Sequence, residues 1–184
     1  MSDGQLTPPV STRDHAAGSG DAPVTLVEYG DYECPYCGMA HLIVKEAQRE
    51  LGSELRFVFR NFPLAEAHPH ARAAAQSAEA AATQGRFWEM HDMLFEHQDA
   101  LEAEDLLAYA KSLGLDMQKF ARDLADATIT KRVRDDFGSG VRSAVNGTPT
   151  FFMNGVRHDG SWANKAAFIN SLREAARQAA ETSA

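Results

Sequence analysis

The sequence has little cysteine: among 184 residues there are two, Cys34 and Cys37. Two are too few for the disulfide framework of a small secreted scaffold, and no second pair completes a four-cysteine zinc site. A chain of this length hides roughly 70% of its unfolded surface on folding, so its core needs no crosslinks. The pair is therefore a redox dithiol, half of a metal site or a coincidence of spacing.

Long apolar runs and an excess of positive charge are also absent. No stretch approaches the roughly 20 apolar residues of a membrane helix, so we expect no membrane span. Residues 1–9 lack the basic start and the apolar run of a signal peptide, which favours a cytoplasmic protein. The 18 Lys and Arg are outnumbered by 26 Asp and Glu, and the net charge of −8 repels phosphate backbones. Nucleic acid is therefore not an expected partner.

The residues around the cysteines predict a strand, a helix and a second strand. Residues 24–29 are β-branched and aromatic, which is typical of a buried strand. Residues 39–51 have apolar side chains at helical spacing, and Gly52 supplies a stop. Residues 55–59 form the next expected strand. A right-handed crossover would make the two strands parallel in one sheet.

The remainder predicts helices and one hairpin. Residues 66–127 carry no strand pattern, so we expect an inserted helical subdomain rather than a long loop. Asn154-Gly155 between two short apolar runs is a strong hairpin signal. The expected helices cover 71–82, 87–97, 104–113, 117–124, 130–145 and 163–180, the hairpin strands cover 150–153 and 156–158, and a short edge strand is expected at 10–12.

The spacing Cys34-Pro35-Tyr36-Cys37 has a physical logic when it opens a helix. Proline suits the first helical turn, where its missing N–H costs nothing. The sulfur of Cys34 then faces unpaired N–H groups and the positive end of the helix dipole, which favour a thiolate, while Cys37 lies one turn deeper. A zinc site would need two further ligands, from pairs such as His68 with His70, and we expect no metal.

Two further positions bear on the same chemistry. Pro149 directly precedes an expected strand, and a cis Thr148–Pro149 bond would let the Thr148 backbone meet an extended substrate, although only about 5% of X–Pro bonds are cis. Glu28 is an acid within an apolar strand, and its burial would raise its pKa and suit it to exchange a proton with Cys37. The alternative is that Glu28 faces solvent.

These residues resemble the DsbA-like branch of the thioredoxin superfamily over about residues 10–168. Residues 27–37 are the most specific part, followed by residues 147–151. The resemblance implies an α/β, thioredoxin-like fold with an inserted helical subdomain. The expected parts are a flexible N-terminal lead-in (1–20), the first part of the thioredoxin-like domain (21–63), the helical subdomain (64–128), the second part of the thioredoxin-like domain (129–180) and a tail (181–184).

The same resemblance assigns roles at the site. It implies that Cys34 is the nucleophile, Cys37 the resolving thiol, Pro149 the cis-proline opposite them and Glu28 the buried acid. The substrate-binding residues expected beside these four are Pro35, Tyr36 and Thr148. The implied partners are protein or peptide thiols and disulfides and an unidentified redox recycling partner, with no cofactor other than the redox-active disulfide Cys34–Cys37.

One departure from the family concerns the dipeptide between the cysteines. In the best-known members it contains a histidine, whereas here it is Pro35-Tyr36, so we expect a milder oxidant. The net direction of electron flow is open. Reduction of cellular disulfides is one of the two directions, because the redox potential of the cytosol keeps such a pair largely reduced. A glutathione- or small-thiol-linked reductase, and a non-catalytic protein-binding module on the same fold, are the alternatives.

Some residues have a simpler structural interpretation. His68 and His70 flank Pro69 and are expected to shape a turn, with contact to a substrate groove as the alternative. Phe87, Trp88, Met90 and Phe95 stand at helical spacing and are expected in a core rather than in a peptide-binding patch. Tyr32 and Tyr36 are expected at the rim of the site, because they adjoin the cysteines, and Trp162 is a third candidate for the rim.

Overall fold

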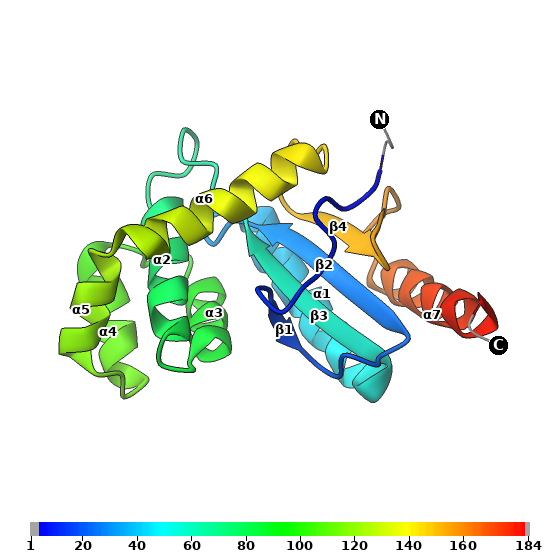
Figure 1. Cartoon of the computed structure of the whole chain (residues 1–184), viewed down its shortest axis with the longest axis horizontal. Coiled ribbons are helices and arrows are strands. Elements are labelled where there is room, and N and C mark those ends of the chain that lie inside the picture. Colours follow the sequence, from blue (N-terminus) through cyan, green and yellow to red (C-terminus); the bar gives the residue numbers. More distant parts are fainter. Residues whose placement is uncertain (1–3, 183–184) are drawn as a thin grey trace. The chain divides into compact units, whose positions relative to one another are not determined.

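The structure is a computed structural model that describes residues 4–182 (Figure 1). The strands are β1 (His15–Ala17), β2 (Val24–Gly30), β3 (Leu55–Asn61), β4 (Thr150–Met153) and β5 (Val156–Arg157). The α-helices are α1 (Pro35–Leu51), α2 (Ala71–Ala82), α3 (Phe87–Glu96), α4 (Ala103–Ser112), α5 (Met117–Leu124), α6 (Ala127–Arg142) and α7 (Lys165–Thr182), and a short 3-10 helix, η1, covers Gly52–Glu54. This is the predicted mixed α/β, thioredoxin-like fold.

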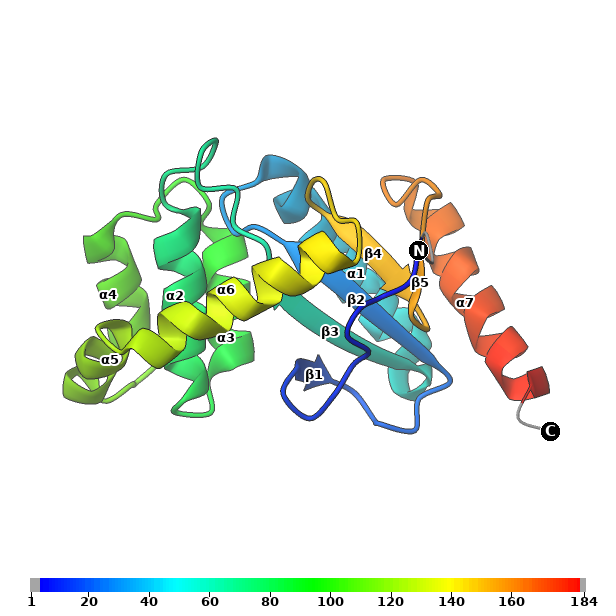
Figure 2. The same cartoon turned by 45° about the horizontal axis from the view of Figure 1, so that its top comes forward.

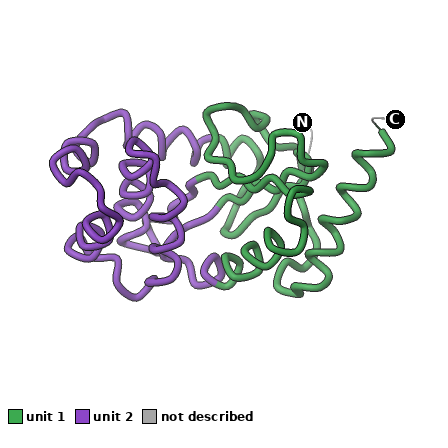
Figure 3. Tube along the Cα trace, turned by 90° about the horizontal axis from the view of Figure 1, so that it is seen from below, with its two compact units in different colours: residues 1–29, 39–60, 139–184 green, residues 30–38, 61–138 purple. Residues whose placement is uncertain are grey.

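The chain divides into two compact units (Figure 3). The sheet unit comprises the described residues of Met1–Tyr29, Met39–Arg60 and Ser139–Ala184. The helical unit comprises Gly30–Gly38 and Asn61–Gly138. The helical unit therefore includes the cysteine-bearing loop in addition to the helices expected over 64–128.

The sheet unit is built on five strands in the order β1-β3-β2-β4-β5. β2 and β3 lie side by side and run in the same direction, as the crossover through α1 predicts, and β5 forms the edge opposite β1 (Figures 1 and 2). β4 pairs antiparallel with both β2 and β5. Asn154 and Gly155 have positive φ angles of 49° and 83°, which a two-residue hairpin turn requires, so the predicted hairpin is confirmed.

The N-terminal segment differs from expectation. The edge strand predicted at 10–12 is wrong, because β1 at His15–Ala17 pairs with β3 instead. A turn explains the difference: the Asp14 N–H donates to the Ser11 carbonyl at 3.1 Å, and the Ser11 N–H donates to the Asp14 carboxylate at 2.8 Å. Of the expected flexible lead-in, residues 1–3 lie outside the described residues. The rest is held on the sheet unit, with Leu6 buried.

A buried ion pair holds this segment. Arg60 on β3 donates to Asp14 at 2.8 Å, and both side chains are almost fully buried. The guanidinium also donates to the carbonyls of Pro8 and Pro9 and to the Tyr29 hydroxyl at 3.0, 3.2 and 2.9 Å. Burial lowers the pKa of Arg60, but the hydrogen bonds to Asp14 and Tyr29 outweigh burial and raise it. Removing one partner would leave a buried charge unpaired, which costs about 3–5 kcal/mol in folding stability.

The helical unit holds the helices close together through small side chains. α2 has the predicted bounds and buries most of its alanines, which lets neighbouring helices approach. Phe87, Met90 and Phe95 are buried, as their predicted core placement requires. α6 begins earlier than expected, because the Asp126 carboxylate accepts the Thr128 N–H at 2.7 Å. No helix among residues 4–182 has both the length and the apolar character of a membrane span.

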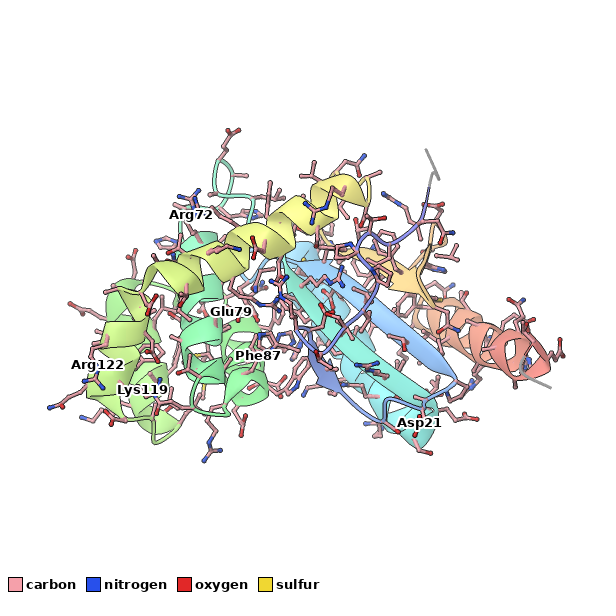
Figure 4. The ribbon with its side chains drawn as sticks, in the orientation of Figure 1. Asp21, Arg72, Glu79, Phe87, Lys119 and Arg122 are labelled. Carbon is pink, nitrogen blue, oxygen red and sulfur yellow. The ribbon has the colours of Figure 1, made fainter. Side chains whose placement is uncertain are left out.

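A cluster of buried polar side chains joins α2, α6 and the end of β3 in the helical unit. The Asn61 amide donates to Glu79 at 2.7 Å and to Asp136 at 3.1 Å. Arg132 lies 3.6 Å from Glu79 and 3.4 Å from Asp136. Glu79 is labelled on α2 in Figure 4. Burial raises the pKa of Asp136 to about 6, with Arg132 opposing the shift and Glu79 adding to it.

Asp136→Asn is expected to change how stability depends on pH. A carboxyl group whose pKa is higher in the folded than in the unfolded protein stabilises the folded state while it is protonated. For Asp136 this stabilisation is fully present below about pH 4 and is lost as pH rises through about 6. The asparagine variant has no carboxyl at this position and does not lose stability in this way. The unfolding free energy of the variant minus that of the wild type should therefore rise by about 2–3 kcal/mol from about pH 4 to about pH 7.5. Urea unfolding at both pH values measures this difference.

The control for this experiment is Asp135→Asn, because Asp135 makes a more exposed ion pair with Lys131. The control should differ from wild type by nearly the same amount at both pH values. A constant difference for Asp136→Asn as well would show that Asp136 is ionised throughout this range in the folded protein.

Candidate active site

The loop between β2 and α1 determines the positions of the two cysteine sulfurs. The Cys34 N–H donates to the Asp31 carbonyl at 3.2 Å, and the Gly38 N–H donates to the Cys34 carbonyl at 3.1 Å. Pro35 is the first residue of α1, as its missing N–H favours. Cys34 is 4% exposed and Cys37 is 0% exposed. Cys34 is therefore the sulfur at the helix N-terminus, and Cys37 is the deeper one.

Asp31 organises this loop from a buried position. Its carboxylate accepts the N–H groups of Glu33 and Leu64, each at 2.8 Å. The His68 imidazole nitrogen Nδ1 lies 2.8 Å from the same carboxylate. The backbone N–H of Asp31 donates to the Cys37 sulfur at 3.4 Å. One residue thus joins the deeper sulfur, the segment after β3 and an imidazole.

The charge of His68 is coupled to Cys34. Burial lowers the pKa of His68, but the hydrogen bond and charge of Asp31, then the charges of Cys34 and Glu33, outweigh burial and raise it. Coulombic coupling is mutual, so an imidazolium at His68 favours a thiolate at Cys34. His68 was expected to shape a turn, with contact to a substrate groove as the alternative, and the structure places it in the same charged network as the cysteines.

His70 joins a second carboxylate network on the same loop. The imidazole Nδ1 of His70 lies 2.8 Å from the Glu33 carboxylate, and the backbone N–H of His70 donates to the same carboxylate at 2.6 Å. Its Nε2 lies 3.1 Å from Glu102, the N-cap residue of α4. The hydrogen bond to Glu33 is the main cause that raises the pKa of His70. These contacts hold the cysteine loop to the start of α2 and to α4.

Gln98, which follows α3, clamps the backbone at the cysteines. Its amide donates to the carbonyls of Tyr32 and Cys34 at 2.8 and 2.9 Å. Gly38 leaves space for this side chain, because a Cβ at that position would lie 2.8 Å from the amide carbon of Gln98. No motif in the sequence marks Gln98, whose contact with Cys34 spans 64 positions.

The two tyrosines beside the cysteines have opposite environments. Tyr32 is buried, its hydroxyl lies 3.1 Å from His91 Nδ1, and its ring packs 4.8 Å from that of Phe95. The expectation that Tyr32 forms the rim is therefore wrong, because α3 supplies it with both an apolar and a polar partner. Tyr36 is 61% exposed and is available to a substrate.

Three predicted site residues belong to the sheet unit. Glu28 on β2 is 1% exposed and stands opposite Phe151 of β4, so the solvent-facing alternative for Glu28 is wrong. The Thr148–Pro149 peptide bond is cis and directly precedes β4. The approach of Glu28, Thr148 and Pro149 to the cysteines stays a prediction.

Similar sequences occur within longer proteins. The chain is 49% identical over 157 residues to "Na(+)/H(+) antiporter NhaA 1" of Salinispora arenicola, covering 85% of this chain and 24% of that protein. It is 43% identical over 178 residues to "Na(+)/H(+) antiporter NhaA" of Herminiimonas arsenicoxydans, covering 96% and 28%. The chain thus spans about a quarter of the length of the curated relatives it matches.

Similar structures belong to proteins of comparable size. Oxidised BdbD from Bacillus subtilis matches with a TM-score of 0.81 and 25% identity, covering 95% of this chain and 97% of that one. A thioredoxin-like oxidoreductase from Silicibacter pomeroyi matches with a TM-score of 0.79 and 25% identity, covering 91% and 94%. For α-DsbA1 from Wolbachia pipientis the TM-score is 0.81 at 20% identity, covering 97% and 98%, a likeness of fold.

The family model described as Thioredoxin matches residues 11–171, which include both cysteines and the cis-proline. That span covers most of the sheet unit and all of the helical unit. The neighbour from Silicibacter pomeroyi, which covers 91% of this chain, is described as a thioredoxin-like oxidoreductase. The chain therefore belongs to the thioredoxin family.

Proposed function

We propose that the chain is a thiol:disulfide oxidoreductase that exchanges disulfides with protein or peptide thiols through Cys34 and Cys37. The observation that carries this proposal is the placement of Cys34, at the N-terminus of α1 and coupled to the raised pKa of His68. Helix dipole and imidazolium both favour a thiolate there. The structural neighbours support the general class of chemistry.

In the reductive direction, the Cys34 thiolate attacks a substrate disulfide. The substrate S–S bond breaks, one substrate sulfur leaves and takes up a proton, and a mixed disulfide joins Cys34 to the other. Cys37 then loses its proton, attacks the Cys34 sulfur and releases the second substrate thiol. Two electrons have passed from the pair to the substrate, and a recycling thiol partner restores the dithiol. Oxidation of a substrate runs through the same steps in reverse.

The remaining residues support these steps. We assign to the Asp31 N–H a contact that stabilises developing negative charge on Cys37, from its 3.4 Å approach to that sulfur. We assign to Glu28 the acceptance and return of the Cys37 proton, because a buried carboxyl has a raised affinity for protons. Pro35 and Tyr36, both exposed, and Thr148 with Pro149 would contact the substrate backbone and side chains.

Glu28→Gln is expected to slow exchange at least about tenfold near neutral pH and to change its pH dependence, because the amide cannot take up a proton. Stopped-flow exchange with a disulfide peptide across the pH range measures both effects. Glu54→Gln, an exposed position in η1, is the matched control and should leave the profile unchanged. Unaltered kinetics in Glu28→Gln with a native circular dichroism spectrum would reduce Glu28 to a structural role.

Two alternative functions make different predictions. A glutathione-linked reductase on this fold would turn over glutathione mixed disulfides faster than insulin, whereas the proposed enzyme should reduce insulin or oxidise a reduced peptide. A non-catalytic module would retain partner binding after both cysteines become serine. Assaying the wild type on these substrates, and the double serine variant for binding, separates the three.

The longer relatives suggest a setting for this chemistry. Their names describe Na⁺/H⁺ antiporters, and the segment they share with this chain includes the cysteine loop and the helical unit. We propose that this segment is the thiol-exchange part of those proteins. A cytoplasmic workplace would favour net reduction, since the glutathione poise there keeps the pair reduced. Thiol trapping of the pair in cells reports its redox state directly.

A further inference from the structure

A cavity of about 910 Å³ lies within the helical unit, between the segment that follows β3 and the helices α2 and α6. We call it the α2–α6 groove. Its apolar lining includes Leu64, Ala67, Val133 and Phe137, and Arg72 and Arg134 also contribute to it. This volume is in the range of about 300–1,000 Å³ that is common for binding sites.

An aromatic ring forms one wall of the groove. Phe137 stacks on Phe62 with ring centroids 4.3 Å apart and an interplanar angle of 15°. Phe62 is buried, whereas Phe137 is 36% exposed, so part of the Phe137 side chain faces solvent. A bulky apolar side chain packed there would bury apolar area on both partners.

The groove carries positive charge on an acidic protein. Arg72 on α2 and Arg134 on α6 are exposed, and neither forms an ion pair with any residue from 4 to 182. Figure 4 labels Arg72 at the start of α2. Glu66 is the one acidic residue of the lining, which leaves an excess of positive charge in a chain whose net charge is −8. A ligand carboxylate would complement these guanidinium groups.

One residue of the groove lining is hydrogen-bonded to the cysteine loop. Leu64 lines the groove, and its N–H donates to the Asp31 carboxylate at 2.8 Å. The N–H of Asp31 in turn donates to the Cys37 sulfur. A polypeptide joined to Cys34 by a mixed disulfide would hold its neighbouring residues at high effective concentration near this groove.

We propose that the α2–α6 groove binds an extended segment of the substrate protein in which a bulky apolar side chain adjoins an acidic residue. The apolar side chain packs against Phe137, and the carboxylate pairs with Arg72 and Arg134. This inference rests on the proposed function and names the class of substrate sequence that the enzyme prefers.

Fluorescence anisotropy tests the binding step without any redox chemistry. The probe is a short, cysteine-free, fluorescein-labelled peptide containing glutamate followed by phenylalanine. Replacing its phenylalanine by alanine, or its glutamate by lysine, should weaken binding about fivefold to tenfold. Equal affinity for all three peptides would overturn the proposal.

A charge swap locates the site. Arg72→Glu and Arg134→Glu should each weaken binding of the glutamate peptide by a similar factor and strengthen binding of the lysine peptide. Arg122→Glu on α5 is the matched control, because Arg122 is exposed and lies outside the groove, and it should leave both affinities unchanged. Equal losses in all three variants, without recovery by the lysine peptide, would indicate a general charge effect and overturn the assignment.

Two further measurements separate the possible failures. Exchange with dithiothreitol, which has no peptide to bind, should be equal in the wild type, Arg72→Glu and Arg134→Glu; its absence in the wild type would refute the proposed function instead. Sedimentation should show one species at all concentrations. A concentration-dependent dimer that Arg72→Glu dissociates would assign the groove to a second copy of the chain and overturn the proposal.

Discussion

Cys34→Ser is expected to abolish disulfide exchange, whereas Cys37→Ser is expected to trap substrates covalently. The reason is the unequal placement of the sulfurs. Cys34 directly precedes α1 and is coupled to His68, whereas Cys37 is fully buried one helical turn later. Without Cys34 no sulfur attacks the substrate. Without Cys37 the attack proceeds, but nothing breaks the mixed disulfide.

Non-reducing gels after an acid quench display this asymmetry, and peptide mapping identifies the cysteine that carries the adduct. The Cys37→Ser protein should accumulate adducts on Cys34 that dithiothreitol releases, and the double serine variant should form none. Adducts on Cys37 in the Cys34→Ser protein, or two equally inert single variants, would reverse or remove the assigned roles. Full activity in both variants would refute the redox function itself.

His68→Gln is expected to lower the reactivity of Cys34 about tenfold near pH 6. Because its pKa is raised, His68 is positively charged at pH values at and below the ordinary pKa of histidine. This charge favours the Cys34 thiolate. The effect should be fully present at acidic pH and should fade as pH rises through the pKa of His68. Loss of about 1.4 kcal/mol of thiolate stabilisation would also lower the reduction potential by about 30 mV.

Alkylation of reduced protein by iodoacetamide, followed by mass spectrometry from about pH 4 to about pH 9, measures this change as a shift of the reactivity curve toward higher pH. His97→Gln is the matched control, because His97 contacts the Met93 carbonyl on α3 rather than the cysteine loop. Superimposable curves for wild type and His68→Gln would show that the imidazole does not stabilise the thiolate. A shift in His97→Gln as well would indicate a non-specific effect of losing positive charge.

The elements that could be predicted from sequence are those whose causes are local. α2 and α5 have the expected bounds, and the hairpin turns at Asn154-Gly155 as expected. Helical spacing, capping residues and turn chemistry act over a few positions, so the sequence displays them directly. β1 could not be placed in this way, because a three-residue edge strand has little pattern of its own and depends on its pairing with β3.

The residues that surround the cysteines could not be predicted from local pattern. His68 meets Asp31 across 37 positions, and Gln98 meets Cys34 across 64. Tyr32 was misassigned for the same reason, since the partner that buries its hydroxyl lies on α3. One sequence feature could have indicated His68: the segments that follow two neighbouring parallel strands meet at the same edge of a sheet.

A redox titration of the Cys34–Cys37 pair against glutathione buffers measures directly whether the two sulfurs form a redox couple. We expect one two-electron transition, and the oxidised protein should have lost the mass of two hydrogens. Because the dipeptide is Pro35-Tyr36 and His68 supplies the neighbouring charge, the potential should lie between about −270 mV, the value of thioredoxin, and about −120 mV, the value of DsbA. Absence of an intramolecular disulfide under the most oxidising buffer, or a potential below about −300 mV as in structural disulfides, would show that Cys34 and Cys37 are not a catalytic redox pair.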